Sequence, residues 1–473
     1  MLFNSFVFPV FFLIVYIIYR GSSHKLQNRL LLLASYVFYG SWDWRFLPLI
    51  LLSTVVDYYC GLNIDKFSDT RRRKTYLHLS LLVNLGTLGV FKYFNFFSDN
   101  LQSLMSQFGL HLDGLTLDIL LPVGISFYTF QTLSYTIDIY LNKSKPERNF
   151  LNFALFVSFF PQLVAGPIER STRLLPQIQF PRKITAAKNK EGLWFIFWGY
   201  FLKIFVADNM AKISDRVFAE TAPQSGGEAL MGMYAFAFQI FGDFAGYSFI
   251  AIGVAKLLGF DLMTNFLFPY FVTNPTDFWK NWHISLSSWL RDYLYIPLGG
   301  NRNGSLMTYR NLFITMFLGG LWHGAAWTFV IWGIFHGVLL SLFRVLKPMT
   351  EKMKISSTYL LITYALKVVI MFHLTCLGWL IFRAESLQQI VAFLQAIIFN
   401  IGSMTDRLQY YVLFMIFHLW LLCLIQFIQK RKGDLMALEN IQWCPSWIFY
   451  IMMLYSMLFW GEFGGQQFIY FQF

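Results

Sequence analysis

A histidine inside an apolar stretch is the residue of this chain best suited to chemistry. Residues 319–327 read GGLWHGAAW, which places His323 among small residues and between two tryptophans, Trp322 and Trp327. Small residues allow backbones to approach closely, and an ionisable group at membrane depth is a functional candidate. Histidine titrates near neutrality and can take a proton from a hydroxyl. The pattern therefore favours His323 as a general base; the alternative is a core histidine that bonds a backbone carbonyl.

A second histidine, His336, follows in the same apolar stretch. If this stretch were one helix, His336 would lie on a different face from His323. No HxxxH or HExxH spacing occurs in the chain, so we expect no metal site. A structural role for His336 and a supporting role in the site both stay open.

Asp243 lies inside the apolar segment 229–260. An unpaired carboxylate is costly in a membrane, so it needs a partner there. The sequence leaves two roles open, a polar contact between helices and support of the site.

Residues 274–297 combine aromatic and charged side chains. Apolar residues recur at three- and four-residue offsets: Phe278, Trp282, Leu286, Trp289 and Tyr293. This periodicity predicts an amphipathic helix at the cytoplasmic interface, with Asn274 or Thr276 as its cap. It is either an interfacial anchor or a helix that folds inward and lines an entry for a charged donor.

The elements that position these residues must be membrane helices. Of 473 residues, 56% are hydrophobic and 13% are charged, whereas a soluble chain carries about 25% charged residues. The apolar blocks approach the length that crosses a bilayer, and helices satisfy their own backbone there. We expect an all-α, polytopic protein with a single domain over 1–473 and roughly ten or eleven spans. The predicted spans are 3–19, 30–42, 46–62, 76–97, 117–140, 192–206, 229–260, 360–382, 409–428 and 447–460.

The loops predict orientation. The net charge of +12 comes mostly from short basic loops, which is the pattern of cytoplasmic loops and not of nucleic-acid binding. Two apolar segments, 150–166 and 311–340, have basic loops on both sides, so each is predicted to be a hairpin or re-entrant element. With these assigned, both ends of the chain are expected outside the cytoplasmic membrane.

Other classes find little support in the sequence. No GxxxxGK[ST] or GxSxG motif occurs. The four cysteines are widely spaced and suggest neither a disulfide framework nor a metal site. A transporter without chemistry, or a scaffold of a secretion complex, stays open as an alternative, although no repeated halves are visible.

Taken together, several segments resemble the membrane-bound O-acyltransferase family. They follow in order along nearly the whole chain: 121–130, 160–168, 243–248, 278–302, 319–327 and 468–473. The resemblance implies helices around a central tunnel, with the signature histidine at His323 and a second family position at His283. It also suggests supporting or tunnel-lining roles for Trp322, Asp243, Arg291, Asp292 and His336.

The resemblance further implies a reaction. In this branch of the family the donor is acetyl-CoA on the cytoplasmic side, and the acetyl group passes toward hydroxyls of an exported polysaccharide. A partner of the SGNH esterase/transferase type outside the membrane often completes the transfer. A related branch instead moves D-alanyl groups from a carrier-protein thioester, and this alternative stays open. By analogy with that branch, Tyr470 is a candidate acyl relay; the alternative is an aromatic anchor at the membrane surface.

Overall fold

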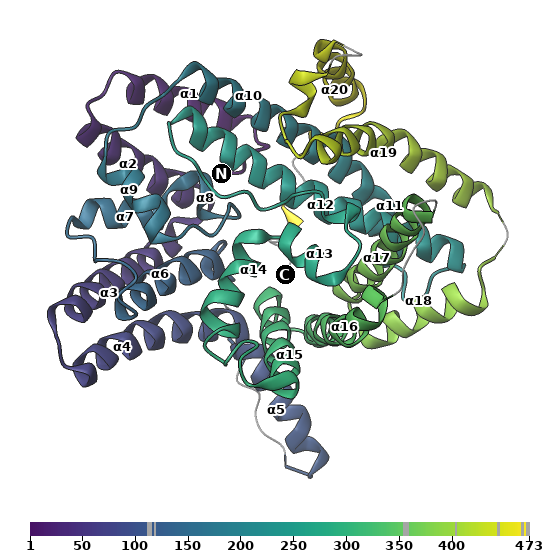
Figure 1. Ribbon diagram of the computed structural model, residues 1–473, viewed down its shortest axis with the longest axis horizontal. Coiled ribbons are helices and arrows are strands. Elements are labelled where there is room, and N and C mark those ends of the chain that lie inside the picture. The colour runs from purple at the N-terminus through teal and green to yellow at the C-terminus, as the bar shows by residue number, and fades with distance from the viewer. Residues whose placement is uncertain are drawn as a thin grey trace. The chain divides into compact units, whose positions relative to one another are not determined.

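The computed structural model describes residues 1–110, 116–117, 120–352, 359–402, 404–441, 445–464 and 468–469. Every regular element in these ranges is a helix, which confirms the all-α prediction (Figure 1). The chain forms two compact units, one from residues 1–193 and 251–263 and the other from 194–250 and 264–473. Two helices, α10 (Ala186–Tyr200) and α12 (Gly226–Leu257), contribute residues to both units. The single domain over 1–473 stays a prediction.

The first unit is built on helices packed around buried polar side chains. Its helices are α1 (Val7–Arg20), α2 (His24–Asp43), η1 (Trp44–Phe46), α3 (Leu47–Lys66), α4 (Thr70–Leu88), η2 (Gly89–Tyr93), α5 (Phe94–Gln107), α6 (Ile125–Tyr140), α7 (Phe150–Ser158), α8 (Phe160–Leu163) and α9 (Ser171–Gln179). The Asp57 carboxylate of α3 accepts hydrogen bonds from Ser80 Oγ at 2.5 Å and Asn84 Nδ2 at 2.8 Å. Neutral donors thus satisfy this buried carboxylate, and the sequence reasoning did not single it out.

The predicted re-entrant segment 150–166 is interrupted in the structure. Helix α7 ends at Ser158, and the short α8 begins at Phe160. Polar side chains satisfy the backbone groups that the break leaves without helical partners. Ser35 Oγ accepts from the Phe160 N–H at 3.0 Å, and Gln131 Nε2 donates to the Phe156 carbonyl at 2.6 Å. The helix is therefore interrupted, with its backbone buried in protein, and a hairpin or re-entrant path for this segment stays a prediction.

The second unit holds the segments singled out as chemical. Its helices are η3 (Phe201–Ala207), α11 (Asp208–Phe218), η4 (Pro269–Phe271), α13 (Pro275–Asn281), α14 (Ile284–Leu290), η5 (Arg291–Tyr295), α15 (Gly304–His323), α16 (Trp327–Lys352), α17 (Leu360–Arg383), α18 (Leu387–Phe399), α19 (Asp406–Lys432), η7 (Ala437–Asn440) and α20 (Ser446–Trp460). Helices α15 and α16 lie side by side, and α17 packs against α16 (Figure 1).

Six helical runs of the described residues are long and apolar enough to cross a membrane. They are His24–Lys66, Thr70–Gln107, Gly226–Leu257, Trp327–Met349, Leu360–Arg383 and Asp406–Lys432. Helices α1, α18 and α20 are apolar but shorter. The protein is thus a multi-pass membrane protein, with fewer full-length spans than the ten or eleven expected. One reason is visible at segment 117–140, where the helix begins only at Ile125 because Gly124 adopts a positive φ of 77°.

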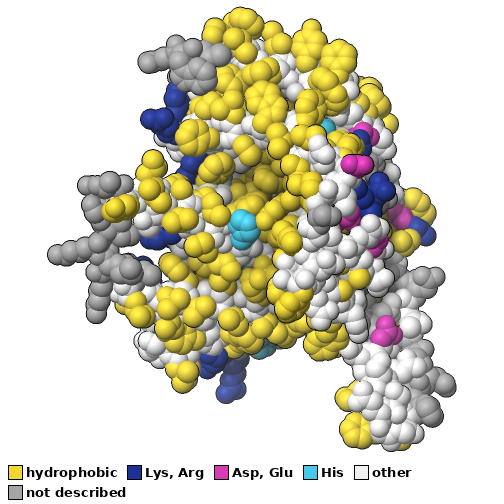
Figure 2. Space-filling view, turned by 90° about the vertical axis from the view of Figure 1, so that its right-hand side faces the viewer, with side chains coloured by type: hydrophobic (Ala, Val, Ile, Leu, Met, Phe, Trp, Pro, Cys, Tyr) yellow, Lys and Arg dark blue, Asp and Glu magenta, His cyan; other side chains and the backbone are white. Residues whose placement is uncertain are grey.

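The surface of the second unit is apolar where lipid would contact it. Figure 2 looks onto the side of Figure 1 on which α17, α18 and α19 lie, and hydrophobic side chains dominate that face. Leu361 of α17 is 79% exposed, and Ile416 of α19 is 59% exposed. An apolar face of this extent is unfavourable in water and favourable in a bilayer.

Candidate functional site

The predicted hairpin 311–340 is confirmed. Helix α15 ends at His323, residues 324–326 are not helical, and α16 returns from Trp327. The two helices cross at glycines: a Cβ on Gly320 would lie 2.3 Å from the Phe329 carbonyl oxygen, and one on Gly333 would lie 2.4 Å from that of Met316. The small residues thus bring the backbones together as the sequence predicted, and they place His323 at the turn of the hairpin.

His323 is enclosed by aromatic rings. Its side chain is buried, and its ring centroid lies 5.0 Å from that of Trp322, 4.9 Å from Trp332 and 5.3 Å from Phe382. The rings come from α15, α16 and α17, so the three helices together fix the position of the imidazole. Aromatic walls exclude water and strengthen electrostatic interactions inside the site.

His336 approaches the same group of rings. Its ring centroid lies 4.8 Å from that of Trp332 and 5.0 Å from that of Trp279 in α13. Because the helix breaks after His323, both imidazoles contact the Trp332 ring. The separation of the two histidines onto different faces would apply only to one continuous helix, and the predicted hairpin replaces that helix.

His283 occupies a break between α13 and α14. Its φ is 42°, an uncommon backbone conformation for a residue other than glycine. An extended segment holds this break on both sides: the Leu267 N–H donates to the Asn281 carbonyl, and the Ile284 N–H donates to the Asn265 carbonyl, each at 3.0 Å. The predicted continuous helix over 274–297 is thus wrong, because a segment distant in the sequence supplies competing backbone partners.

The His283 ring is buried and connects the break to the hairpin. Its centroid lies 4.5 Å from Phe244 of α12 and 6.0 Å from Trp322. His283, Trp322, His323, Trp332 and His336 therefore form one continuous run of ring contacts. We call this run the imidazole cluster.

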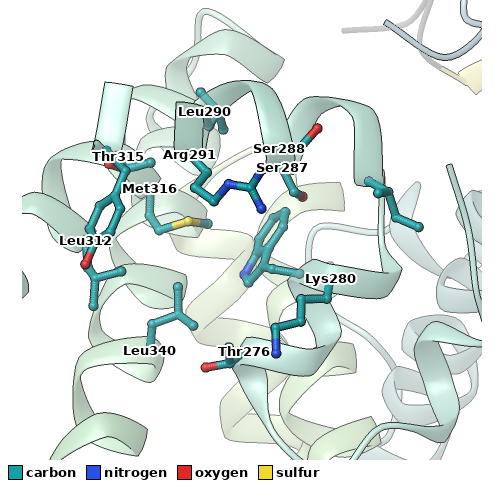
Figure 3. Close-up of a pocket in the computed structure, with 13 residues that line it drawn as sticks. Thr276, Lys280, Ser287, Ser288, Leu290, Arg291, Leu312, Thr315, Met316 and Leu340 are labelled. Carbon is teal, nitrogen blue, oxygen red and sulfur yellow. The ribbon is translucent and has the colours of Figure 1, made fainter. Parts of the chain in front are cut away.

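A cavity of about 370 Å³ lies between the segment α13–η5 and the hairpin α15–α16 (Figure 3). Its lining combines the cations Lys280 and Arg291, hydroxyls from Thr276, Ser287, Ser288 and Thr315, and apolar side chains that include Trp279, Met316 and Leu340. Figure 3 shows Arg291 and Met316 pointing toward the interior and Lys280 beside Thr276. Since Trp279 also contacts His336 and Trp332, one wall of the cavity belongs to the surroundings of the imidazole cluster.

A second hollow, of about 530 Å³, shares Lys280 and Tyr295 with this cavity and adds Arg344 and Lys347. The Lys280 ammonium pairs with Asp277 at 3.1 Å, and Arg291 Nε donates to Asp292 at 2.8 Å. Burial raises the pKa of the Asp277 carboxyl, but hydrogen bonds from Asn274 and Lys280 outweigh it and leave that pKa lowered. Asn274 also caps α13, as predicted, by accepting from the Asp277 N–H. The two hollows carry more basic than acidic groups and suit a phosphorylated ligand.

Asp243 has a charged partner, as the sequence analysis predicted for a carboxylate inside an apolar segment. Its Oδ1 lies 2.8 Å from Lys203 Nζ, and the same ammonium lies 2.8 Å from Asp208 Oδ1. All three side chains are buried, at 7% exposure or less. The sequence analysis did not single out Lys203 or Asp208. The lysine inside the predicted span 192–206 could have indicated a buried ion pair, because a charged residue at membrane depth needs a partner.

The remaining candidates fall outside this group. Arg291 and Asp292 lie by the cavity rather than in the imidazole cluster, and the Arg291 side chain is 62% exposed. Tyr470 lies outside the described residues. Its neighbours Phe468 and Ile469 are buried in the second unit.

These features define an integral membrane protein with a buried imidazole, His323, that is connected through the Trp332 ring to Trp279 in the lining of a basic cavity. Residues 42–383, which include the imidazole cluster and both hollows, match the membrane-bound O-acyltransferase family. The chain belongs to this family, and it is an acyltransferase.

The relatives differ in the polymers that their names give. The chain is 45% identical to a probable alginate O-acetylase of Pseudomonas aeruginosa over 390 residues, 82% of this chain and 73% of that protein. It is 36% identical to a peptidoglycan O-acetyltransferase of Helicobacter pylori, over 84% of this chain and 80% of that protein. It is 29% identical to a teichoic acid D-alanyltransferase of Bacillus subtilis, over 56% of this chain and 69% of that protein.

Proposed function

We propose that the protein moves an acetyl group from cytoplasmic acetyl-CoA toward hydroxyls of an exported or cell-surface polysaccharide, with His323 as the general base. The observation that carries the proposal is the burial of His323 within the imidazole cluster, whose wall at Trp279 also lines the basic cavity. The O-acetyltransferase relatives that cover more than four fifths of this chain support a carbohydrate acceptor.

The donor would bind from the basic side. Lys280, Arg291, Arg344 and Lys347 would attract the phosphates of coenzyme A. The hydroxyls and apolar side chains of the smaller cavity would surround the thioester arm. The positive-inside pattern of the loops favours a cytoplasmic location for this side and an extracytoplasmic location for both ends of the chain.

The reaction balances without a metal or redox partner. His323 takes the proton of the acceptor hydroxyl while the hydroxyl oxygen forms a bond to the carbonyl carbon of the thioester. The C–S bond breaks, and the proton leaves on the thiol of coenzyme A. A base in this role typically contributes roughly 10²–10⁴-fold to the rate.

Transfer of the acetyl group to the final polysaccharide acceptor would require a partner protein. An SGNH-type transferase outside the membrane would pass the acetyl group to the polymer, and Tyr470 stays a prediction as the relay between the two. The D-alanyl transferase relative favours, as the second candidate, a donor thioester on a carrier protein. Its phosphopantetheine arm would offer the same thioester to the same cavity.

His323→Gln is expected to lower acetyl transfer from radiolabelled acetyl-CoA by about 10²–10⁴-fold. The purified protein is assayed in liposomes, and esterified acetate on exported glycan is measured in cells that lack the wild-type copy. His78→Gln is the matched control, since this exposed histidine lies in the first unit. Normal transfer by His323→Gln at normal abundance would exclude the base role. Wild-type protein that neither transfers nor hydrolyses the thioester would favour a transporter.

A further inference from the structure

The segment that follows α20 is attached to the second unit near the π-helical turn η3. This tail segment comprises residues 461–464 and 468–469 of the described chain. The Glu462 N–H donates to the Ile204 carbonyl at 2.9 Å, and the Glu462 carboxylate pairs with Lys212. Just before it, Asn209 Nδ2 donates to the Trp460 carbonyl at 2.7 Å. The first attachment therefore uses η3 and the start of α11.

The second attachment is made at a buried ion cluster. The Ile469 N–H donates to Asp243 Oδ2 at 2.7 Å, while Asp243 Oδ1 pairs with Lys203. Lys203 is shared with Asp208, so two carboxylates face one ammonium in a buried position. A buried ion pair is costly unless hydrogen bonds satisfy the remaining donors and acceptors of the charged groups. The backbone N–H of the tail segment supplies such a bond.

The attachment fixes a ring that supports the site. Phe468 is buried beside Ile469, and its ring centroid lies 5.0 Å from Tyr247 and 5.9 Å from Phe244. Phe244 in turn contacts His283 at 4.5 Å. Ring contacts thus run from the docked tail segment to the imidazole cluster.

We propose that Lys203, Asp208 and Asp243 are positioning residues that dock the tail segment, so that Phe468 holds Phe244 and His283 in the arrangement required for acyl transfer. The inference rests on the proposed function for its activity readout. If the cluster served only to join η3 and α11 to α12, the tail segment would be dispensable for turnover. The two roles are separable because the contact with the tail is made by a backbone N–H.

The test removes that N–H without touching the ion cluster. Ile469→Pro lacks the donor, whereas the control Ile469→Val keeps it at similar volume. Hydrogen exchange followed by mass spectrometry on the full chain in detergent reports the docking of residues 461–464 and 468–469. In liposomes, kcat and the donor KM are measured with acetyl-CoA as the release of free coenzyme A thiol.

Loss of a hydrogen bond to a charged group weakens the docking equilibrium by about ten- to a hundredfold, so Ile469→Pro is expected to lose exchange protection in the tail segment and to lower kcat. The donor KM should stay near the wild-type value because the cavity lining lies on other elements. Phe468→Ala, which keeps the hydrogen bond, should retain protection and still lower kcat.

Lost protection with a normal kcat in Ile469→Pro would overturn the inference, and so would unchanged protection. If Ile469→Pro does not accumulate, Phe468→Ala decides, since a normal kcat for that variant contradicts the positioning role. A wild-type protein without transfer activity would refute the proposed function instead, and hydrogen exchange would still report whether the cluster docks the tail segment.

Discussion

Individual polar residues in apolar helices carry most of the information about this protein. His323, His336 and Asp243 stand out in the sequence because they are ionisable residues in mostly apolar segments, and the structure gives each a defined surrounding. His283 is different, because its importance depends on backbone geometry. Its φ of 42° marks a position where the chain is held in an unfavourable conformation by Asn265 and its neighbours.

Substitutions at His283 should separate backbone strain from chemistry. His283→Asn and His283→Val both remove the buried ring and lose its packing. Asparagine tolerates the left-handed region, whereas His283→Val should lose about 1–2 kcal/mol more because a β-branched residue is disfavoured there. Transfer by His283→Asn should fall about a hundredfold if the imidazole positions the reacting groups. Thermal unfolding and turnover of the purified variants measure both effects, and normal turnover by the asparagine variant would contradict a role for the ring.

At the scale of elements, the sequence predicted which helical segments occur better than it predicted where those segments begin, break and end. The hairpin 311–340 and the interrupted segment 150–166 followed from charge on both flanks, a signal that is local in the chain. The break at His283 could not be predicted, because it depends on backbone hydrogen bonds that the Asn265 carbonyl accepts and the Leu267 N–H donates, which no periodicity reveals. The pairing of Lys203 with Asp243 was likewise hidden, since it requires knowing that η3 and α12 approach each other.

The crossing of α15 and α16 yields a stability prediction. Gly320→Ala would place a methyl group 2.3 Å from the Phe329 carbonyl oxygen, so the helices must separate. We expect a loss of about 1–3 kcal/mol, together with reduced transfer because His323 follows one turn later. Gly319→Ala is the control, since its methyl would meet only a flexible Leu290 methyl group at 3.3 Å. Thermal unfolding followed by tryptophan fluorescence compares the two, and equal losses would contradict the close-crossing explanation.

At the scale of the whole molecule, composition was sufficient for class and membrane location but not for the number of spans. Charge in short loops predicts which side of the membrane each loop faces, and that prediction decides where a donor can enter. The exposed residues Arg71, Arg72 and Lys74 precede the apolar part of α4, whereas 98–110 contains no lysine or arginine. By the same charge rule, the basic hollow at Arg344 and Lys347 should face the same side of the membrane as Arg71, Arg72 and Lys74.

Thiol labelling in whole cells tests this orientation. In a background with Cys423 and Cys444 changed to serine, single cysteines replace the exposed Ser106 and Ser305. Because basic loops stay in the cytoplasm, a membrane-impermeant reagent should label Ser106→Cys in spheroplasts with an intact inner membrane and Ser305→Cys only after permeabilisation. Cys60 and Cys376 are buried and should stay silent, which the background chain verifies. The reverse pattern would put the basic cavity on the outer side, where no acetyl-CoA is present, and the direction of transfer proposed above would then be wrong.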